Sequence, residues 1–300
     1  MKIQPWQLQQ RRCQPLNIKE RMTLSRIKVY HDRCDGNIYV SFSGGKDSTV
    51  LKHLVQRLYP NVRIMFINTG LEFPENVEFV KGLESCDIVR PKKSFLQCFD
   101  TYGYPVVSKE ISSKIYDIRN TQSDYMRNKR LYGDVNGNGK MSEKWKFLIN
   151  APFKISAHCC KILKKAPAKA YEKKTQLHPI VATMADESRL REQQYLKNGC
   201  NSFEGGYMST PMAFWTEKDV WDYIKKYNLQ YSKIYDMGYS RTGCMFCMFG
   251  MQQEKVNRFD LMQQSHPKIW NYCMNKLNLK EIIEYVNNNG KVSENILDLF

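Results

Sequence analysis

The sequence predicts an α/β fold with a doubly wound, mainly parallel sheet and helical additions at its N- and C-terminal ends. Three observations carry this prediction: short apolar runs typical of buried strands, helical spacing of apolar residues between these runs, and short links that join them. Strands and helices that alternate in this way favour right-handed βαβ units, and such units build a parallel sheet with helices on both faces.

The first elements of this pattern occupy the N-terminal third of the chain. Residues 16–33 have helical spacing and belong to a predicted N-terminal helical extension, residues 1–35. A β-branched, apolar strand follows at residues 37–43, and then a helix that ends near Pro60. The next strand, residues 62–70, is closed by Gly70 and followed by a helix that begins at Pro74 and Glu75. A weaker strand at residues 86–91 and two further helical stretches complete this part.

The middle of the chain is polar between about residues 120 and 153, which predicts an exposed insertion or lid. Part of it resembles a calcium loop, because Asp134, Asn136, Asn138 and Gly139 fall at the first, third, fifth and sixth positions of an EF-hand. The twelfth position, which needs a bidentate glutamate, is Trp145. Calcium binding is therefore disfavoured.

The C-terminal half supplies one more strand and several helices. Residues 177–184 read as a strand, and residues 185–196 as a loop that opens a helix. Thr216 is a good N-cap for the next helix, with Asp219 in the place of a capping-box acid. Because no glycine-rich linker interrupts the sequence, we expect one α/β domain over residues 36–250 and a helical tail over residues 251–300.

The composition is that of a globular protein, with 42% hydrophobic and 25% charged residues among 300. No window approaches the roughly eighteen uninterrupted apolar residues of a membrane helix, and the polar N-terminus lacks the apolar core of a signal peptide. We therefore expect a cytoplasmic protein with no membrane partner. The net charge of +16 includes seven lysines against one acid between residues 154 and 174, which favours a polyanionic partner such as a nucleic acid or another phosphate-rich or sulfate-rich substrate.

The segment SGGKDS, residues 43–48, predicts a phosphate-binding loop. Gly44 and Gly45 lie between a strand and a helix, where the backbone can approach an anion and the first N–H groups of the helix can donate to it. Ser43 and Ser48 add hydroxyl groups, and Lys46 adds a positive charge. A Walker A loop is excluded, because Val40 stands where its first glycine belongs and Asp47 stands where Ser or Thr should follow the lysine.

With four further motifs, this loop resembles the PP-loop of the ATP pyrophosphatases. The resemblance is to the branch that contains phosphoadenosine-phosphosulfate (PAPS) and adenosine-phosphosulfate (APS) reductases and the ATP pyrophosphatase of DNA phosphorothioation, and it covers about residues 36–250. It rests on SGGKDS together with NTGLEFPE at 68–75, CCKILKKAP at 159–167, FWTEKDVWDYI at 214–224 and IYDMGYSRTGCMFC at 234–247. It implies an adenine-nucleotide α-hydrolase-like fold.

The resemblance also implies what the loop does. In family members that use ATP the loop holds the β,γ-pyrophosphate, so that a substrate oxygen attacks the α-phosphorus and pyrophosphate leaves. Residues 43–48 would then bind ATP or another adenine nucleotide, with Lys46 as a charge clamp. Asp47 would help to hold Mg²⁺ or orient the loop, or would be only an acid favoured by the helix dipole. Asn68, Thr69 and Gly70 would help to form the adenosine pocket.

Four of the ten cysteines are clustered in two motifs, Cys159 with Cys160 and Cys244 with Cys247. Four thiolates suit either tetrahedral Zn²⁺ or a [4Fe–4S] cluster, and buried thiols without a metal are the third alternative. A CC pair followed far downstream by CxxC resembles the cluster-binding pattern of the APS reductases and of the phosphorothioation protein. Lys164 and Lys165, one helical turn beyond the CC pair, would lie near the cluster and the substrate phosphates. Arg189 and Arg191 follow a strand end and are either contacts for an anion or exposed helix arginines.

Of these residues, Lys46, Asp47, Lys165 and Arg191 are the predicted catalytic ones. Tyr235 and Tyr239 precede the CxxC motif and are either core or site residues.

The resemblance leaves several activities open. The reductases carry a nucleophilic cysteine in an ECG-type motif near the C-terminus, whereas the last 50 residues here contain only Cys273, and Cys200 is the other candidate thiol. The leading hypothesis is an ATP-dependent adenylylating enzyme of sulfur metabolism that acts on DNA, RNA or another phosphate-rich acceptor. The alternatives are an APS or PAPS reductase with an unconventional thiol and a nucleotide-binding regulator without turnover. A cysteine desulfurase or a thioredoxin-like protein would supply sulfur or electrons.

Overall fold

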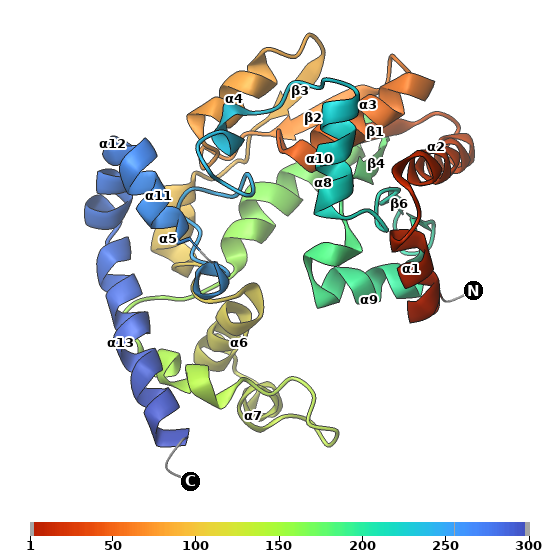
Figure 1. Ribbon diagram of the computed structural model, residues 1–300. Coiled ribbons are helices and arrows are strands. Elements are labelled where there is room, and N and C mark those ends of the chain that lie inside the picture. Colours follow the sequence, from red (N-terminus) through yellow and green to blue (C-terminus); the bar gives the residue numbers. More distant parts are fainter. Residues whose placement is uncertain (1–2, 255, 298–300) are drawn as a thin grey trace. The chain divides into compact units, whose positions relative to one another are not determined.

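The computed structural model describes residues 3–254 and 256–297, which form two compact units (Figure 1). Unit 1 consists of Met1–Asn68, Glu72–Arg90 and Pro167–Thr242, and unit 2 of Thr69–Leu71, Pro91–Ala166 and Gly243–Phe300. The division at residues 35 and 250, which the sequence suggested, does not coincide with these boundaries and stays a prediction. No helix in the described ranges is both long enough and apolar enough to cross a membrane.

Unit 1 contains a six-stranded sheet in the order β3-β2-β1-β4-β6-β5. All neighbouring strands are parallel except β5 and β6, and Val40 in the middle of β1 lies opposite Ile64 of β2 and Ile180 of β4. The predicted α/β class with a mainly parallel sheet is therefore confirmed. The strands are β1 (Ile38–Phe42), β2 (Arg63–Ile67), β3 (Cys86–Val89), β4 (His178–Val181), β5 (Asn201–Ser202) and β6 (Met208–Ser209).

Helices pack on both faces of this sheet, as expected of a doubly wound fold. Side chains alternate between the faces along a strand, so Val40 and Tyr39 of β1 enter different cores. Val40 packs in the core that includes Leu51 of α3, whereas Tyr39 packs against Met65 and Tyr171 of α8. The helices are α2 (Leu16–Arg33), α3 (Lys46–Leu58), α4 (Pro74–Lys81) and α10 (Glu217–Lys226) on the face of Val40, and α8 (Ala166–Thr175) on the other.

The N-terminal helix α2 is part of the core of unit 1. Ile27 and Tyr30 are completely buried, and the ammonium group of Lys19 donates to Asp219 Oδ2 of α10 at 2.6 Å. Unit 1 also contains α1 (Pro5–Arg12) and α9 (Arg189–Asn198), whose Leu8 and Tyr195 belong to the same core as Val40. The predicted N-terminal extension thus contributes α2 to the helices that pack on this face of the sheet.

Unit 2 is mainly helical in its described part. The predicted polar insertion at residues 120–153 contains α7, which buries none of its residues, but it also contains Met141 and Leu148, which are completely buried. Arg119 of α6 holds the end of this segment, because its guanidinium donates to four backbone carbonyls at 2.7–2.9 Å. The helices are α5 (Phe95–Tyr102), α6 (Lys109–Asn120), α7 (Asp124–Tyr132), α11 (Arg258–Ser265), α12 (Pro267–Asn271) and α13 (Leu279–Leu297), with a 3₁₀ helix at Glu143–Asn150.

In the loop that resembles an EF-hand, the carboxylate of Asp134 is bound by nearby backbone N–H groups and by a lysine. Asp134 Oδ1 accepts hydrogen bonds from the backbone N–H groups of Asn136 and Asn138, at 3.0 and 2.9 Å, and Oδ2 lies 3.1 Å from Lys129 Nζ. These contacts lower the pKa of Asp134, with the hydrogen bond from Asn138 as the largest cause. The carboxylate therefore fixes the turn, and the expectation that calcium does not bind here stays a prediction.

Candidate functional site

The predicted phosphate loop lies where the first strand of the sheet ends. β1 ends at Phe42 and α3 begins at Lys46, so only Ser43, Gly44 and Gly45 connect the two elements. β1 lies between β2 and β4. The strands β2 and β3 follow on one side of β1, and the later strands β4, β6 and β5 lie on its other side, so the strand order reverses beside β1. Open α/β sheets bind ligands at such a point.

The loop's conformation requires glycine. Gly44 has a φ of +74°, and a Cβ atom there would lie 2.4 Å from Asn76 Oδ1. Asn76 of α4 is buried and donates from Nδ2 to the carbonyl oxygen of Ser43 at 2.9 Å, while its Oδ1 has no hydrogen-bond partner. Asn76 therefore fixes the start of the loop and was not identified from the sequence.

The two serine hydroxyls stabilise the loop from within. Ser48 Oγ accepts from the N–H of Ser43 at 3.2 Å and donates to the carbonyl oxygen of Gly45 at 2.9 Å. Ser43 Oγ lies 3.1 Å from Ser48 Oγ and accepts from the N–H of Gly45 at 3.3 Å. Both serines thus hold the backbone of residues 43–48 in shape.

Lys46 is only 4% exposed, and both of its donor groups already have protein partners. Its ammonium group donates to the carbonyl oxygen of Ser240 at 2.9 Å and lies 3.1 Å from Glu217 Oε1. Its backbone N–H donates to Tyr235 Oη at 2.8 Å. The rings of Trp221 and Tyr235 lie 6.0 and 5.4 Å from the ammonium group, within the range of cation–π attraction.

Asp47 and Arg191, both predicted to be catalytic, influence each other electrostatically in unit 1. Burial raises the pKa of Asp47, and the charges of Lys46 and Arg191 only partly offset this effect. Asp47 Oδ1 is buried without a hydrogen-bond partner, as expected of an oxygen that a hard cation such as Mg²⁺ could use. Burial lowers the pKa of Arg191, which forms an ion pair with Glu187. Arg189 is exposed.

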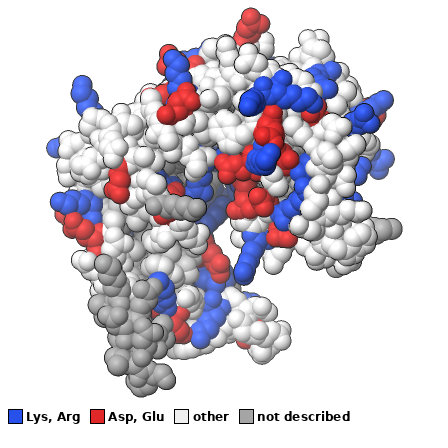
Figure 2. All heavy atoms as spheres, viewed as in Figure 1, with Lys and Arg blue, Asp and Glu red and all other residues white. Residues whose placement is uncertain are grey.

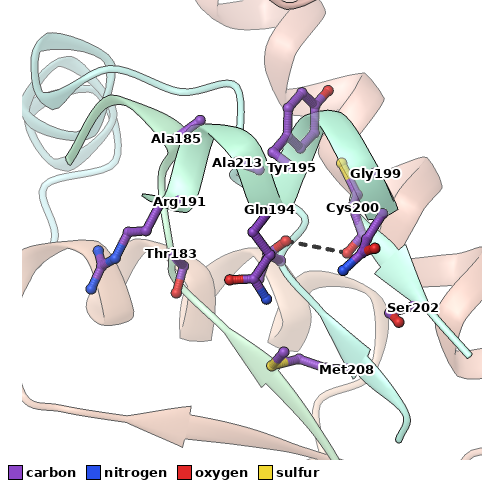
Figure 3. Close-up of a pocket in the computed structure, with 12 residues that line it drawn as sticks. Thr183, Ala185, Arg191, Gln194, Tyr195, Gly199, Cys200, Ser202, Met208 and Ala213 are labelled. Carbon is purple, nitrogen blue, oxygen red and sulfur yellow. Dashed lines mark hydrogen bonds between the residues drawn. The ribbon is translucent and has the colours of Figure 1, made fainter. Parts of the chain in front are cut away.

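A pocket lies beyond the carboxyl ends of β4 and β6 in unit 1 (Figure 3). Thr183 follows β4, Thr210 follows β6, and Arg191 and Gln194 line the pocket from α9. Cys200 lines the same pocket but is only 6% exposed, and burial raises the pKa of its thiol. That environment does not favour a reactive thiolate.

The residues predicted for the adenosine pocket divide between the units. Asn68 belongs to unit 1, where its N–H donates to the carbonyl oxygen of Val89 at 2.9 Å. Thr69 and Gly70 belong to unit 2, where Thr69 Oγ1 accepts from the N–H of Leu71 at 3.2 Å. The carbonyl oxygen of Leu71 in turn accepts from the N–H of Met245, between the two CxxC cysteines. A role of these residues in nucleotide binding stays a prediction.

The four clustered cysteines line a single pocket in unit 2. Cys159 and Cys160 lie where a short π-helix, Cys160–Lys165, begins, and π-helical turns are frequent at functional sites. The remaining lining is mostly apolar, so the thiols face a pocket that excludes much of the solvent. The full lining is Leu71, Phe99, Pro105, Cys159, Cys160, Leu163, Lys164, Cys244, Phe246 and Cys247.

The charge around this pocket favours ionisation of one thiol of the pair. A hydrogen bond from Cys159 lowers the pKa of Cys160, and Lys109, Lys164 and Lys165 contribute in the same direction. The pKa of Cys159 is correspondingly raised, and burial raises the pKa of Cys247 to about 11. Lys165 therefore lies near the cysteines in unit 2. In the part of the chain that the structure describes, no three His, Cys, Asp or Glu side chains are arranged to hold a single metal ion.

The seven lysines between residues 154 and 174 are all exposed, four in unit 2 and three in unit 1. Figure 2 shows that Lys and Arg on the displayed face lie next to Asp and Glu side chains. The surplus charge is thus available to a polyanionic partner, whose identity stays a prediction.

A family model described as the phosphoadenosine phosphosulfate reductase domain matches residues 37–106 and 113–249. The chain belongs to this family. The phosphoadenosine phosphosulfate reductase domain lies within the PP-loop, adenine-nucleotide α-hydrolase-like superfamily that the motifs indicated, so the broader resemblance is confirmed. The narrower relation to DNA phosphorothioation stays a prediction.

Several proteins are similar to this chain at low sequence identity. Two uncharacterized proteins of Methanocaldococcus jannaschii are 26% and 25% identical, over 84% and 86% of this chain and 51% and 45% of their own lengths. The chain thus spans about half the length of these relatives. An adenosine 5'-phosphosulfate reductase of Anoxybacillus flavithermus is 21% identical over 81% of this chain and 86% of its own length. A solved structure, a PAPS reductase from Candida auris with phosphate, matches with a TM-score of 0.40 and 18% identity over 69% of this chain and 81% of that one.

Proposed function

We propose that the protein is an ATP-dependent adenylylating enzyme of sulfur metabolism that acts in the cytoplasm. The observation that carries this proposal is the loop at residues 43–48, which joins the end of β1 directly to the N-terminus of α3 at the sheet's switch point. Backbone N–H groups and a helix N-terminus at such a point favour a bound polyphosphate.

The loop's residues would stabilise the part of ATP that leaves. An acceptor oxygen attacks the α-phosphorus, the bond from this phosphorus to the bridging oxygen breaks, and pyrophosphate leaves with the electron pair. The N–H groups of Gly45 and Lys46 and the ammonium group of Lys46 would neutralise the charge that develops on pyrophosphate. Asp47 would hold Mg²⁺, which supplies further charge neutralisation when bound, and Arg191 would contact an anionic group of the acceptor.

Pyrophosphate release tests this proposal. Lys46→Ala should lower pyrophosphate release from ATP at least about 100-fold, because one group that stabilises transition-state charge typically contributes this much. Lys218→Ala is the matched control, since Lys218 lies exposed on α10 and pairs with Asp222 on the same helix. No ATP turnover by the anaerobically purified wild-type protein, with any acceptor tried, would contradict the proposal.

We propose that Cys159, Cys160, Cys244 and Cys247 hold a [4Fe–4S] cluster. Its support is the convergence of all four thiols on one largely apolar pocket, together with a low thiol pKa at Cys160. Such a cluster would position or pass sulfur. Anaerobically purified protein should contain iron and sulfide with broad visible absorbance, lost together in Cys159→Ser or Cys244→Ser and retained in Cys13→Ser, whose thiol is exposed. Stoichiometric zinc would contradict the cluster.

An APS or PAPS reductase is the second candidate, and the similarity to the adenosine 5'-phosphosulfate reductase of Anoxybacillus flavithermus favours it. The reductase hypothesis requires a cysteine that acts as the nucleophile, and the two candidate thiols are poorly suited to this role. Burial raises the pKa of Cys273 to about 12 and also raises that of Cys200. Sulfite release from APS or PAPS with thioredoxin would decide for the reductase. A third possibility, a regulator without turnover, would show tight adenine-nucleotide binding and no product.

The acceptor we propose is DNA, RNA or another phosphate-rich molecule, and the exposed lysines between residues 154 and 174 are the support for it. A cysteine desulfurase or a thioredoxin-like protein would supply sulfur or electrons. Mass spectrometry of molecules that copurify with the protein, nucleic acid included, would identify these partners. Copurification of neither nucleic acid nor any other polyanion would argue against this class of acceptor.

A further inference from the structure

Protein oxygen atoms surround the donor groups of the phosphate loop in unit 1. Tyr235 Oη accepts from the backbone N–H of Lys46 at 2.8 Å, and the carbonyl oxygen of Ser240 accepts from its ammonium group at 2.9 Å. Glu217 Oε1 lies 3.1 Å from the same ammonium group. A Cβ atom on Gly45 would lie 2.6 Å from Thr242 Oγ1, so this hydroxyl sits directly over the loop backbone.

These oxygen atoms lie on or beside the donor groups that a bound polyphosphate would use. An anion bound at the N-terminus of α3 needs the first free N–H groups of the helix, and the lysine side chain is the loop's positive charge. Three of the four oxygens come from the segment of residues 235–242, and the fourth comes from the first turn of α10. The segment is well anchored, because the ring of Tyr235 packs against Trp221 at 5.4 Å and Tyr231 at 6.1 Å.

We propose that residues 235–242, together with Glu217, form an internal competitor for the anion site, and that the phosphates of a di- or triphosphate displace it. The inference rests on the proposed function, because it assumes that this loop binds phosphate. It makes Tyr235 a positioning residue that sets the affinity of the loop for its ligand. A neutral hydroxyl gives a weaker hydrogen bond than a charged phosphate oxygen, so the phosphate replaces it.

The test is calorimetric titration of Tyr235→Phe with inorganic pyrophosphate and Mg²⁺. Phenylalanine keeps the ring contacts with Trp221 and removes only the hydroxyl. The N–H of Lys46 then lacks its partner in the free protein, and one lost hydrogen bond of this kind should make pyrophosphate bind about five-fold more tightly. Tyr171→Phe is the matched control: its hydroxyl donates to Asp87 at 2.6 Å in the core on the other face of the sheet, and the variant's affinity for pyrophosphate should equal that of the wild type.

Glu217→Gln provides a second, independent variant. It removes the negative charge beside the ammonium group of Lys46 and should also tighten pyrophosphate binding, whereas Asp222→Asn on the same helix should not. Because both residues lie on the exposed side of α10, neither change should prevent folding, and thermal denaturation without ligand checks this point.

The outcomes separate this inference from the proposed function. Tighter binding in Tyr235→Phe, or binding that appears only in this variant, supports the competitor. If the wild type binds pyrophosphate and Tyr235→Phe binds it with equal or lower affinity, the hydroxyl of Tyr235 does not compete with the ligand. The competitor is then refuted, while the proposed function stands. If neither protein binds pyrophosphate or ATP, both proposals are overturned.

Discussion

At the residue scale, Gly44 combines two requirements that only glycine meets. Its φ is +74°, and a Cβ atom would lie 2.4 Å from Asn76 Oδ1. Gly44→Ala should lower the free energy of unfolding by about 2 kcal/mol, of which about 1 kcal/mol reflects the backbone conformation. It should also abolish pyrophosphate binding, because the loop must shift.

Gly205→Ala separates the two contributions. Gly205 has a similar φ of +70° but no atom within 4 Å of a Cβ. We expect only the backbone cost of about 1 kcal/mol there, and normal pyrophosphate binding. Urea denaturation measures both variants, and equal losses with binding retained in Gly44→Ala would contradict the account of the loop.

Asp47 is expected to lower stability at neutral pH. The pKa of Asp47 in the folded protein is raised above the ordinary value of 3.8. Protonated Asp47 therefore contributes to stability below pH 3.8, and this contribution is lost as the pH rises through the folded pKa. Asp47→Asn should therefore raise the melting temperature at pH 8, by about 2 °C for a change of about 1 kcal/mol, and the gain should shrink as the pH falls to 5. Pyrophosphate release should fall in the same variant. A lower melting temperature than that of the wild type at pH 8 would contradict this expectation.

At the scale of elements, two ion pairs join α2 to α10, Lys19 with Asp219 and Glu20 with Lys226, and the first is buried on both sides. Lys19 Nζ lies 2.6 Å from Asp219 Oδ2, and the two side chains are 2% and 12% exposed. Lys19→Ala leaves the buried carboxylate without its cation and should lower the free energy of unfolding by about 3 kcal/mol. Lys218→Ala, which removes an 83% exposed lysine from a surface pair, should change it by less than about 0.5 kcal/mol. Similar small effects in both variants would show that α2 is not held in this way.

Most elements of the sheet and its helices could be predicted from the sequence, because their signals are local. The apolar period changes from strand to helix at residue 46, and Thr216 with Asp219 forms the predicted capping box. The two-residue strands β5 and β6 are too short for any period to show. The π-helix at Cys160–Lys165 was not predicted either, since the extra residue per turn has no sequence signature.

The candidate site was predictable only where its residues are contiguous. SGGKDS and the two cysteine motifs are short patterns with a chemical meaning. The partners of Lys46 are not, because Glu217, Tyr235 and Ser240 lie more than 170 residues away along the chain and reach it only through the packing of unit 1. Tyr235 in particular could not be assigned to core or site before its hydroxyl was seen on the N–H of Lys46.

At the scale of the whole molecule, the chemistry falls into two sets of residues. The phosphate loop with Asp47 and Arg191 belongs to unit 1, and the four cysteines with Lys165 belong to unit 2. The chain passes from one unit to the other after residues 68, 71, 90, 166 and 242. The last of these boundaries lies between the segment that holds Lys46 and the CxxC motif.

The central claim is that the loop holds the leaving pyrophosphate of ATP. Phosphorus NMR of the products formed from ATP, Mg²⁺ and copurified acceptor by the anaerobically purified protein tests it most directly. The account predicts pyrophosphate in an amount equal to the AMP transferred or released. ADP with inorganic phosphate would contradict it, because attack would then occur at the γ-phosphorus, and unchanged ATP alongside sulfite release from APS would assign the site to reduction instead.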